Sequence, residues 1–93
     1  MKEIKLSGRE MAVLKAIDQT SGTFGPELVT STHLEAQDLV DILTGLMDVG
    51  YVEAYAGEDQ RLPLAEATLA AFATTRFEVN PSYVLQIRQA MKR

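Results

Sequence analysis

The sequence predicts a small α+β domain, and three observations carry that prediction. At 93 residues the chain has the length of one domain, and 46% of its residues are apolar, enough to form a core. Between residues 39 and 47 apolar side chains recur every three or four positions, as on one face of a helix. In residues 51–55 and 76–79 polar and apolar side chains alternate, as in a strand. The expected order over residues 1–93 is helix, short helix, long helix, strand, extra helix, strand and C-terminal helix.

The first two helices are predicted from their start signals. Ser7 and Glu10 have the spacing of a capping box, in which each side chain accepts a hydrogen bond from the backbone N–H of the other residue. Apolar residues at positions 11, 14 and 17 follow at helical spacing. Pro26 is tolerated in the first turn of a helix, so a short second helix is expected over residues 27–29.

A glycine marks the end of the long helix. Gly50 follows the apolar stripe and is expected to form a left-handed C-terminal cap. The strand over residues 51–55 comes directly after it. The polar stretch 57–60 is expected to be a loop.

The C-terminal segment is expected to form an amphipathic helix. Asn80 and Pro81 follow the second strand and are the start signal of this helix. The apolar residues that share one of its faces are Val84, Ile87 and Met91. The cationic residues near its end are Arg88, Lys92 and Arg93, which suit the helix dipole. Its apolar face is expected to pack either on its own domain or across a two-fold axis in a homodimer.

Several segments within residues 7–56 form a further pattern. They are Glu27-Leu28-Val29, His33-Leu34-Glu35, the leucines at positions 39, 43 and 46, and Gly50-Tyr51-Val52. This order of a short helix, a turn, a second helix held by leucines and a glycine before a strand resembles the winged helix-turn-helix domains of bacterial transcription regulators. The resemblance implies a winged-helix-like domain whose second motif helix lies in the major groove of DNA.

Beyond residue 56 the chain departs from that family, whose first wing strand usually runs straight into a hairpin partner. Residues 63–72 are rich in Ala and Leu, which predicts an extra helix. Residues 57–75 therefore form either a helical insertion in the wing or a helix added to the core. We favour the added helix, with Leu69 and Phe72 as core residues.

The charge distribution argues against DNA binding by the second helix of the motif. The residues opposite its leucine stripe are Gln37, Asp38, Asp41, Thr44, Gly45 and Asp48. Between residues 16 and 60 there is no Lys or Arg, and the acidic residues there are Asp18, Glu27, Glu35, Asp38, Asp41, Asp48, Glu53, Glu58 and Asp59. DNA affinity depends mainly on Lys and Arg side chains that neutralise phosphates. Binding through the basic ends of the chain stays an alternative.

Residue types suited to catalysis or metal binding are scarce. The chain has no cysteine, and its one histidine, His33, lies in the predicted turn between two helices, where we expect a structural role. Asp38 and Asp41 are too solvated for an acid–base pair. We therefore expect no enzymatic activity, no cofactor, no metal and no small-molecule ligand. The lack of cysteine gives no sign of an oxidising compartment and favours a cytoplasmic protein. The lack of a long apolar run favours a protein without a membrane partner.

Two tyrosines are candidates for an adhesive surface. Tyr51 and Tyr55 are predicted to project from one side of their strand, with Glu53 between them. Because Val52 and Ala54 on the other side are small, we favour core packing for the tyrosines. A partner-facing aromatic patch is the alternative.

These observations predict a non-enzymatic regulatory module that acts mainly through protein–protein contacts. The candidate interaction residues are Gln37, Asp38, Asp41, Thr44, Asp48, Tyr51, Tyr55, Arg88, Lys92 and Arg93. The expected partner is a basic protein or a second copy of the chain. The alternative function is a DNA-binding transcription regulator of the winged-helix type.

Overall fold

The computed structural model describes residues 5–18, 20–57 and 60–92 and shows an α+β fold. Its α-helices are α1 (Gly8–Ala16), α2 (Gly25–Thr32), α3 (Ala36–Asp48) and α4 (Val84–Met91). Its strands are β1 (Thr23–Phe24), β2 (Val52–Ala56), β3 (Gln60–Leu62) and β4 (Thr75–Val79). Short 3-10 turns are η1 (Leu64–Glu66), η2 (Phe72–Thr74) and η3 (Pro81–Tyr83).

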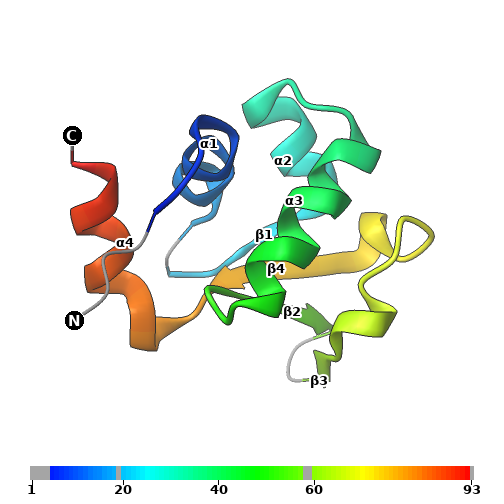
Figure 1. Cartoon of the computed structure of the whole chain (residues 1–93). Coiled ribbons are helices and arrows are strands. Elements are labelled where there is room, and N and C mark those ends of the chain that lie inside the picture. Colours follow the sequence, from blue (N-terminus) through cyan, green and yellow to red (C-terminus); the bar gives the residue numbers. More distant parts are fainter. Residues whose placement is uncertain (1–4, 19, 58–59, 93) are drawn as a thin grey trace.

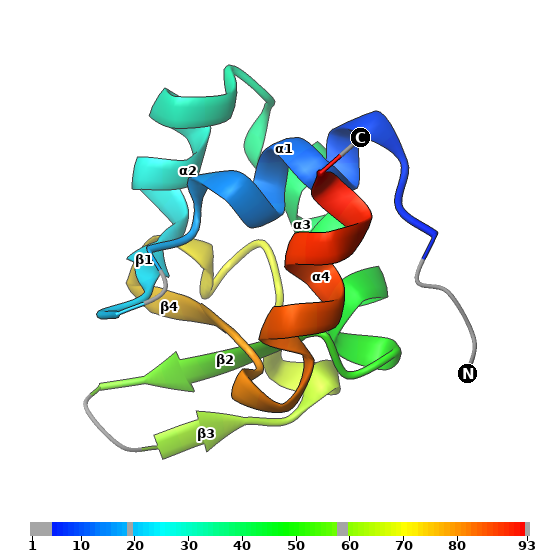
Figure 2. The ribbon, with the colours of Figure 1, turned by 90° about the vertical axis from the view of Figure 1, so that its left-hand side faces the viewer.

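The strands form one antiparallel sheet in the order β1-β4-β2-β3. The α-helices lie on one side of this sheet, and its other face is open (Figures 1 and 2). Along β2 and β4 the buried side chains alternate with partly exposed ones, so Val52, Ala54 and Phe77 face the helices. The leucines of α3 at positions 39, 43 and 46 complete the core and are almost fully buried.

The predicted start of α1 is confirmed. The Glu10 N–H donates to Ser7 Oγ at 3.1 Å, and the Ser7 N–H donates to Glu10 Oε1 at 2.8 Å. The helix ends at Ala16, and the chain turns at Asp18. The Asp18 N–H donates to Thr23 Oγ1 at 2.8 Å, and the Asp18 carboxylate accepts from the N–H of Thr20 at 2.7 Å. This turn leads into β1, a strand that the sequence patterns did not predict.

The predictions for α2, α3 and the strand after them are confirmed, with small shifts in their bounds. Pro26 lies in the first turn of α2, which runs on to Thr32. Gly50 has a φ of 90°, the left-handed conformation expected after α3. His33 ends α2, also in a left-handed conformation, and its side chain is exposed. It therefore has the structural role expected of a turn residue.

The predicted extra helix over residues 63–72 is wrong. The segment forms only the turns η1 and η2, and Leu69, expected in the core, is 48% exposed. Phe72 is buried as expected, but it packs against Gly25 at the start of α2. This tertiary contact, together with the β3 pairing just before the segment, overrides the local helix propensity of the Ala-rich stretch. The loop expected over residues 57–60 likewise ends in β3.

The C-terminal helix packs on its own domain, which is one of the two arrangements expected for it. Ile87 is 1% exposed and belongs to the core, and Val84 and Met91 are packed against that core. Asn80 caps η3 by accepting from the Ser82 N–H at 3.0 Å, and α4 begins after that turn. The Asn80 side chain also donates to the Gly50 carbonyl oxygen at 2.8 Å. The helix lies beside α1 (Figures 1 and 2).

Candidate interaction surfaces

The exposed side of α3 is acidic. Gln37, Asp41 and Asp48 are exposed, whereas Asp38 and Thr44 are half-buried. Gln37 Nε2 donates to Asp41 Oδ1 at 3.1 Å, which orders one of these carboxylates. The Thr44 hydroxyl donates to the Val40 carbonyl oxygen at 2.8 Å, so this side chain is turned toward its own helix. We call Gln37, Asp38, Asp41 and Asp48 the acidic face.

Other acids of the Lys- and Arg-free stretch have structural partners instead. The Asp18 carboxylate holds the turn before β1, and Glu27 Oε1 accepts from the Phe24 N–H at 3.1 Å at the start of α2. Glu53 lies 3.3 Å from Arg61 and accepts from the Tyr55 hydroxyl at 3.0 Å. Glu58 and Asp59 lie outside the described residues. The acidic surface that results from this stretch of the sequence therefore lies mainly on α3.

Tyr55 does not lie on the core side of β2, and Tyr51 precedes this strand and packs against the margin of the core. Val52 and Ala54 are 2% and 0% exposed and face the helices, so the preferred core packing of Tyr55 is wrong. Small residues suit this position because α3 packs directly over β2. Tyr51 is half-buried at the margin of the core and meets Tyr83 edge-to-face, with ring centroids 5.1 Å apart. Tyr55 lies on the open face of the sheet.

A row of aromatic and arginine side chains crosses this open face. The register places Phe24 opposite Arg76, Arg76 opposite Tyr55, and Tyr55 opposite Arg61. Directly opposite residues of antiparallel strands project from the same face. Sequence patterns did not identify Phe24 or Arg61 as neighbours of Tyr55, because β1 and β3 are too short to show a period. Arg76 lies on a strand that the sequence predicts, but alternation does not reveal which strands pair.

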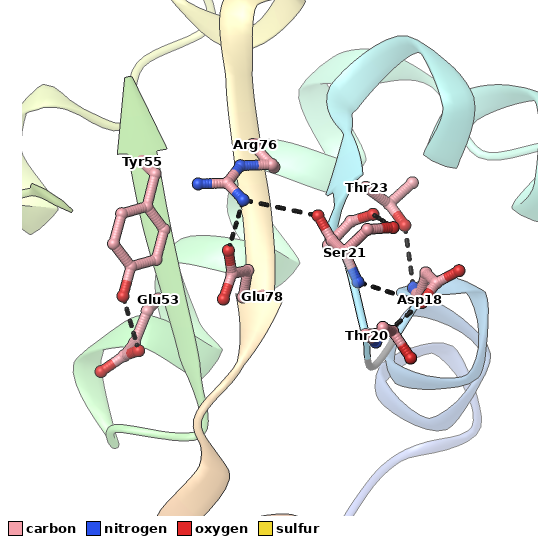
Figure 3. A network of polar contacts seen from close by, with 9 residues as sticks. Asp18, Thr20, Ser21, Thr23, Glu53, Tyr55, Arg76 and Glu78 are labelled. Carbon is pink, nitrogen blue, oxygen red and sulfur yellow. Dashed lines mark hydrogen bonds and ion pairs between the residues drawn. The ribbon is translucent and has the colours of Figure 1, made fainter. Parts of the chain in front are cut away.

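The charges on the open face are paired within the domain (Figure 3). Arg76 Nη1 lies 2.6 Å from Glu78 Oε2, and the same nitrogen donates to the Ser21 carbonyl oxygen at 3.4 Å. Burial raises the pKa of the Tyr55 phenol, and so do its hydrogen bond to Glu53 and the negative charges of Glu53 and Glu78. The open face is therefore a set of internal contacts that hold neighbouring strands together.

The described cationic residues of the C-terminal segment belong to α4 or follow it directly, whereas the acidic face belongs to α3. Arg88 on α4 and Lys92 directly after it are exposed. Arg93 lies outside the described residues. Lys5, Arg9 and Lys15, on α1 or before it, are also exposed, and α1 lies beside α4 (Figure 2). Neither of two ion pairs found among the described residues, Arg61–Glu53 and Arg76–Glu78, joins Arg88 or Lys92 to the acidic face.

A hollow of about 370 Å³ opens beside the C-terminal part of α3. Its apolar walls are Met47, Leu62, Pro63 and Leu64, and Val52 and Ala54 also line it. The paired side chains of Glu53 and Arg61 form its polar part. Leu64 is 41% exposed, so part of this apolar surface is open to solvent.

No protein-family model, no curated protein and no solved structure matches this chain. In residues 5–18, 20–57 and 60–92, no group of three or more acidic or histidine side chains is arranged to hold a metal ion. None of the helices in this part of the chain is both long and apolar enough to cross a membrane.

Proposed function

We propose that this chain is a non-enzymatic, winged-helix-type regulatory module that acts through protein–protein contacts. The observation that carries the proposal is the acidic face, which exposes carboxylates and no cation on the helix that would otherwise meet DNA. A basic surface is its chemical complement. We expect the protein to act in the cytoplasm.

The order of elements supports the winged-helix type. A short helix, α2, is followed by a turn at His33 and by α3, and α3 packs on α2 through buried leucines. Gly50 then leads into β2, and β2 pairs with the next strand in the chain, β3. This is the pattern on which the resemblance rests, with β2 and β3 in the place of a wing.

The charges of such a surface orient a docking partner but contribute little to the binding affinity. An exposed ion pair contributes only about 0.2–1 kcal/mol, whereas complementary potentials accelerate and orient docking. Apolar surface beside the acidic face must therefore supply much of the affinity. The hollow next to Met47 is such a surface.

The proposal is tested by neutralising the acidic face. The purified chain is immobilised, proteins of the source cells that it retains are identified by mass spectrometry, and retention is compared with that by Asp41→Asn/Asp48→Asn. A matched control, Ala12→Lys/Ser31→Lys, changes the net charge equally at exposed positions outside this face. We expect the first variant to lose the same partner that the control keeps. Equal retention by all three proteins, or no retained protein, contradicts the proposal.

A DNA-binding regulator is the second candidate, favoured by the exposed cations of α1 and α4. Lys15, Arg88 and Lys92 belong to helices that lie side by side (Figure 2). Under our proposal the chain does not slow the migration of duplex DNA in a gel-shift measurement at about 0.15 M salt. A salt-dependent shift that Lys15→Glu/Lys92→Glu abolishes would select the DNA-binding function instead.

A further inference from the structure

We propose that the exposed side of α4 in one copy of the chain docks into the hollow beside α3 of a second copy. This inference rests on the proposed function, since it names the partner of the acidic face as the chain itself. It joins two partly exposed apolar surfaces of the described residues: Leu85 on a basic helix, and a hollow beside an acidic one.

The docking element is the solvent side of α4. Leu85 is 70% exposed, more than any other large apolar side chain of the described residues. Arg88, Gln89 and Lys92 are also exposed and lie three, four and seven residues further on, which places them on the same helix face as Leu85. Because Ile87 is buried in the domain core, this exposed face points away from its own domain. We call it the α4 face.

The receiving element is the hollow at the border of α3. Met47 is half-buried and lies on α3 between the buried leucine stripe and the exposed acids. Asp48 follows it directly on the exposed side, so the hollow adjoins the acidic face. Leu64 also lines the hollow and is followed closely by Glu66, another exposed acid. The cation in the hollow, Arg61, is paired with Glu53.

The two surfaces match in charge and in spacing. On α4, Lys92 lies seven residues beyond Leu85, and on α3, Asp41 lies seven residues before Asp48. Each span is about 10 Å along a helix axis. With Leu85 beside Met47 and the two helices antiparallel, Lys92 meets Asp41 and Arg88 lies between the two acids. The apolar contact supplies the affinity, and the charges fix the direction and register of the helix.

The contact joins different surfaces of the two copies. Figure 1 shows α4 at one end of the molecule, and β3 and η1, which border the hollow, toward the other. A copy whose α4 face is docked therefore still presents an empty hollow, and its partner still presents an undocked α4 face. Such a heterologous interface builds rings or open chains of copies, in contrast to a two-fold dimer, which uses one patch twice.

The experiment that tests this heterologous contact mixes two variants, each of which has one of the two contact surfaces disrupted. Sedimentation equilibrium of the purified full chain should show species larger than a dimer as the concentration rises. Leu85→Asp places a charge on the α4 face, and Leu64→Asp places one in the hollow. Each substitution should lower the association constant at least about tenfold. An equimolar mixture of the two should form a one-to-one dimer and nothing larger, because one good surface remains on each variant.

Leu69→Asp is the matched control. Leu69 is 48% exposed, comparable to Leu64, but does not line the hollow. This variant should associate like the wild type, and an unchanged thermal midpoint in all three variants shows that each is folded. Reversal of Asp48 to Lys should weaken association mainly at low salt.

Three results would overturn the inference. They are a monomeric wild type up to about 1 mM, an equimolar mixture that stays monomeric, and a Leu69→Asp variant as defective as Leu85→Asp. A monomeric wild type that still retains another protein through Asp41 and Asp48 would leave the proposed function intact and refute only self-association. A wild type that neither self-associates nor retains another protein would refute both this inference and the proposed function.

Discussion

The guanidinium carbon of Arg76 lies 5.1 Å from the centroid of the Tyr55 ring. The two residues are directly opposite each other on β4 and β2, and Arg76 also bonds to Glu78 and to the Ser21 carbonyl oxygen (Figure 3). One side chain therefore connects two central strands with the turn that precedes β1. A cation over an aromatic face contributes about 0.5–1 kcal/mol where the pair is partly exposed.

The first prediction concerns Arg76. Arg76→Met keeps an apolar stem but removes the cation, and should lower the free energy of unfolding by about 1–2 kcal/mol in urea denaturation. Arg61→Met is the control: its side chain is 67% exposed in its ion pair with Glu53, so its loss should cost no more than about 0.5 kcal/mol. Equal losses in the two variants would show that the central position of Arg76 has no energetic consequence.

The second prediction is a pH dependence that comes from Tyr55. Burial, assisted by Glu53, raises the pKa of this phenol above its unfolded-state value of about 10. The unfolded chain then loses this proton first, so the stabilisation is complete below about pH 10 and is lost as the pH rises through the folded-state pKa. Urea denaturation from pH 8 to 11 should show a steeper alkaline loss of stability in the wild type than in Tyr55→Phe. Parallel curves would contradict this assignment.

The helices were predictable because their signals are local. The capping box at Ser7, the proline at the start of α2 and the leucine spacing of α3 each act within a few residues, and the structure confirms all three. The acidic face follows from the same spacing, since the side opposite a buried stripe must meet solvent. Interactions between residues close in sequence were therefore sufficient to predict these helices and the acidic face.

Other features depend on contacts between distant segments. Strands β1 and β3 contain two and three residues, too few to display alternation. The row of side chains from Phe24 to Arg61 can therefore be recognised only once the register of the strands is known. The Ala-rich stretch over residues 63–72 has helix propensity, but Phe72 is held against Gly25 from the start of α2. Propensity is a weak local preference that such packing readily overrides.

The third prediction compares two glycines in helices. A Cβ atom at Gly25 would come within 2.8 Å of the Phe72 ring and would also collide with the Phe72 carbonyl oxygen, so backbone must move. Gly25→Ala should therefore destabilise the domain by about 1–3 kcal/mol, the usual cost of overpacking. At Gly45, within α3, a Cβ meets nothing within 4 Å, and Ala should stabilise by about 0.5–1 kcal/mol through helix propensity. Thermal or urea denaturation measures both, and a neutral Gly25→Ala would refute the close approach.

The fourth prediction separates the two sides of α4. Ile87 is 1% exposed within the core, and truncation to Ala there should cost about 2–5 kcal/mol because it removes buried methyl groups and leaves a cavity. Leu85, two residues earlier, is 70% exposed, and Leu85→Ala should stay within about 0.5 kcal/mol of the wild type in dilute solution. Both variants remove apolar atoms from the same helix, so the difference between their urea midpoints measures the packing of α4 on its own domain. If the two variants lose equal stability, or neither loses any, α4 does not belong to the core. The Ile87 side chain would then be free to serve as a contact to another molecule, together with Leu85.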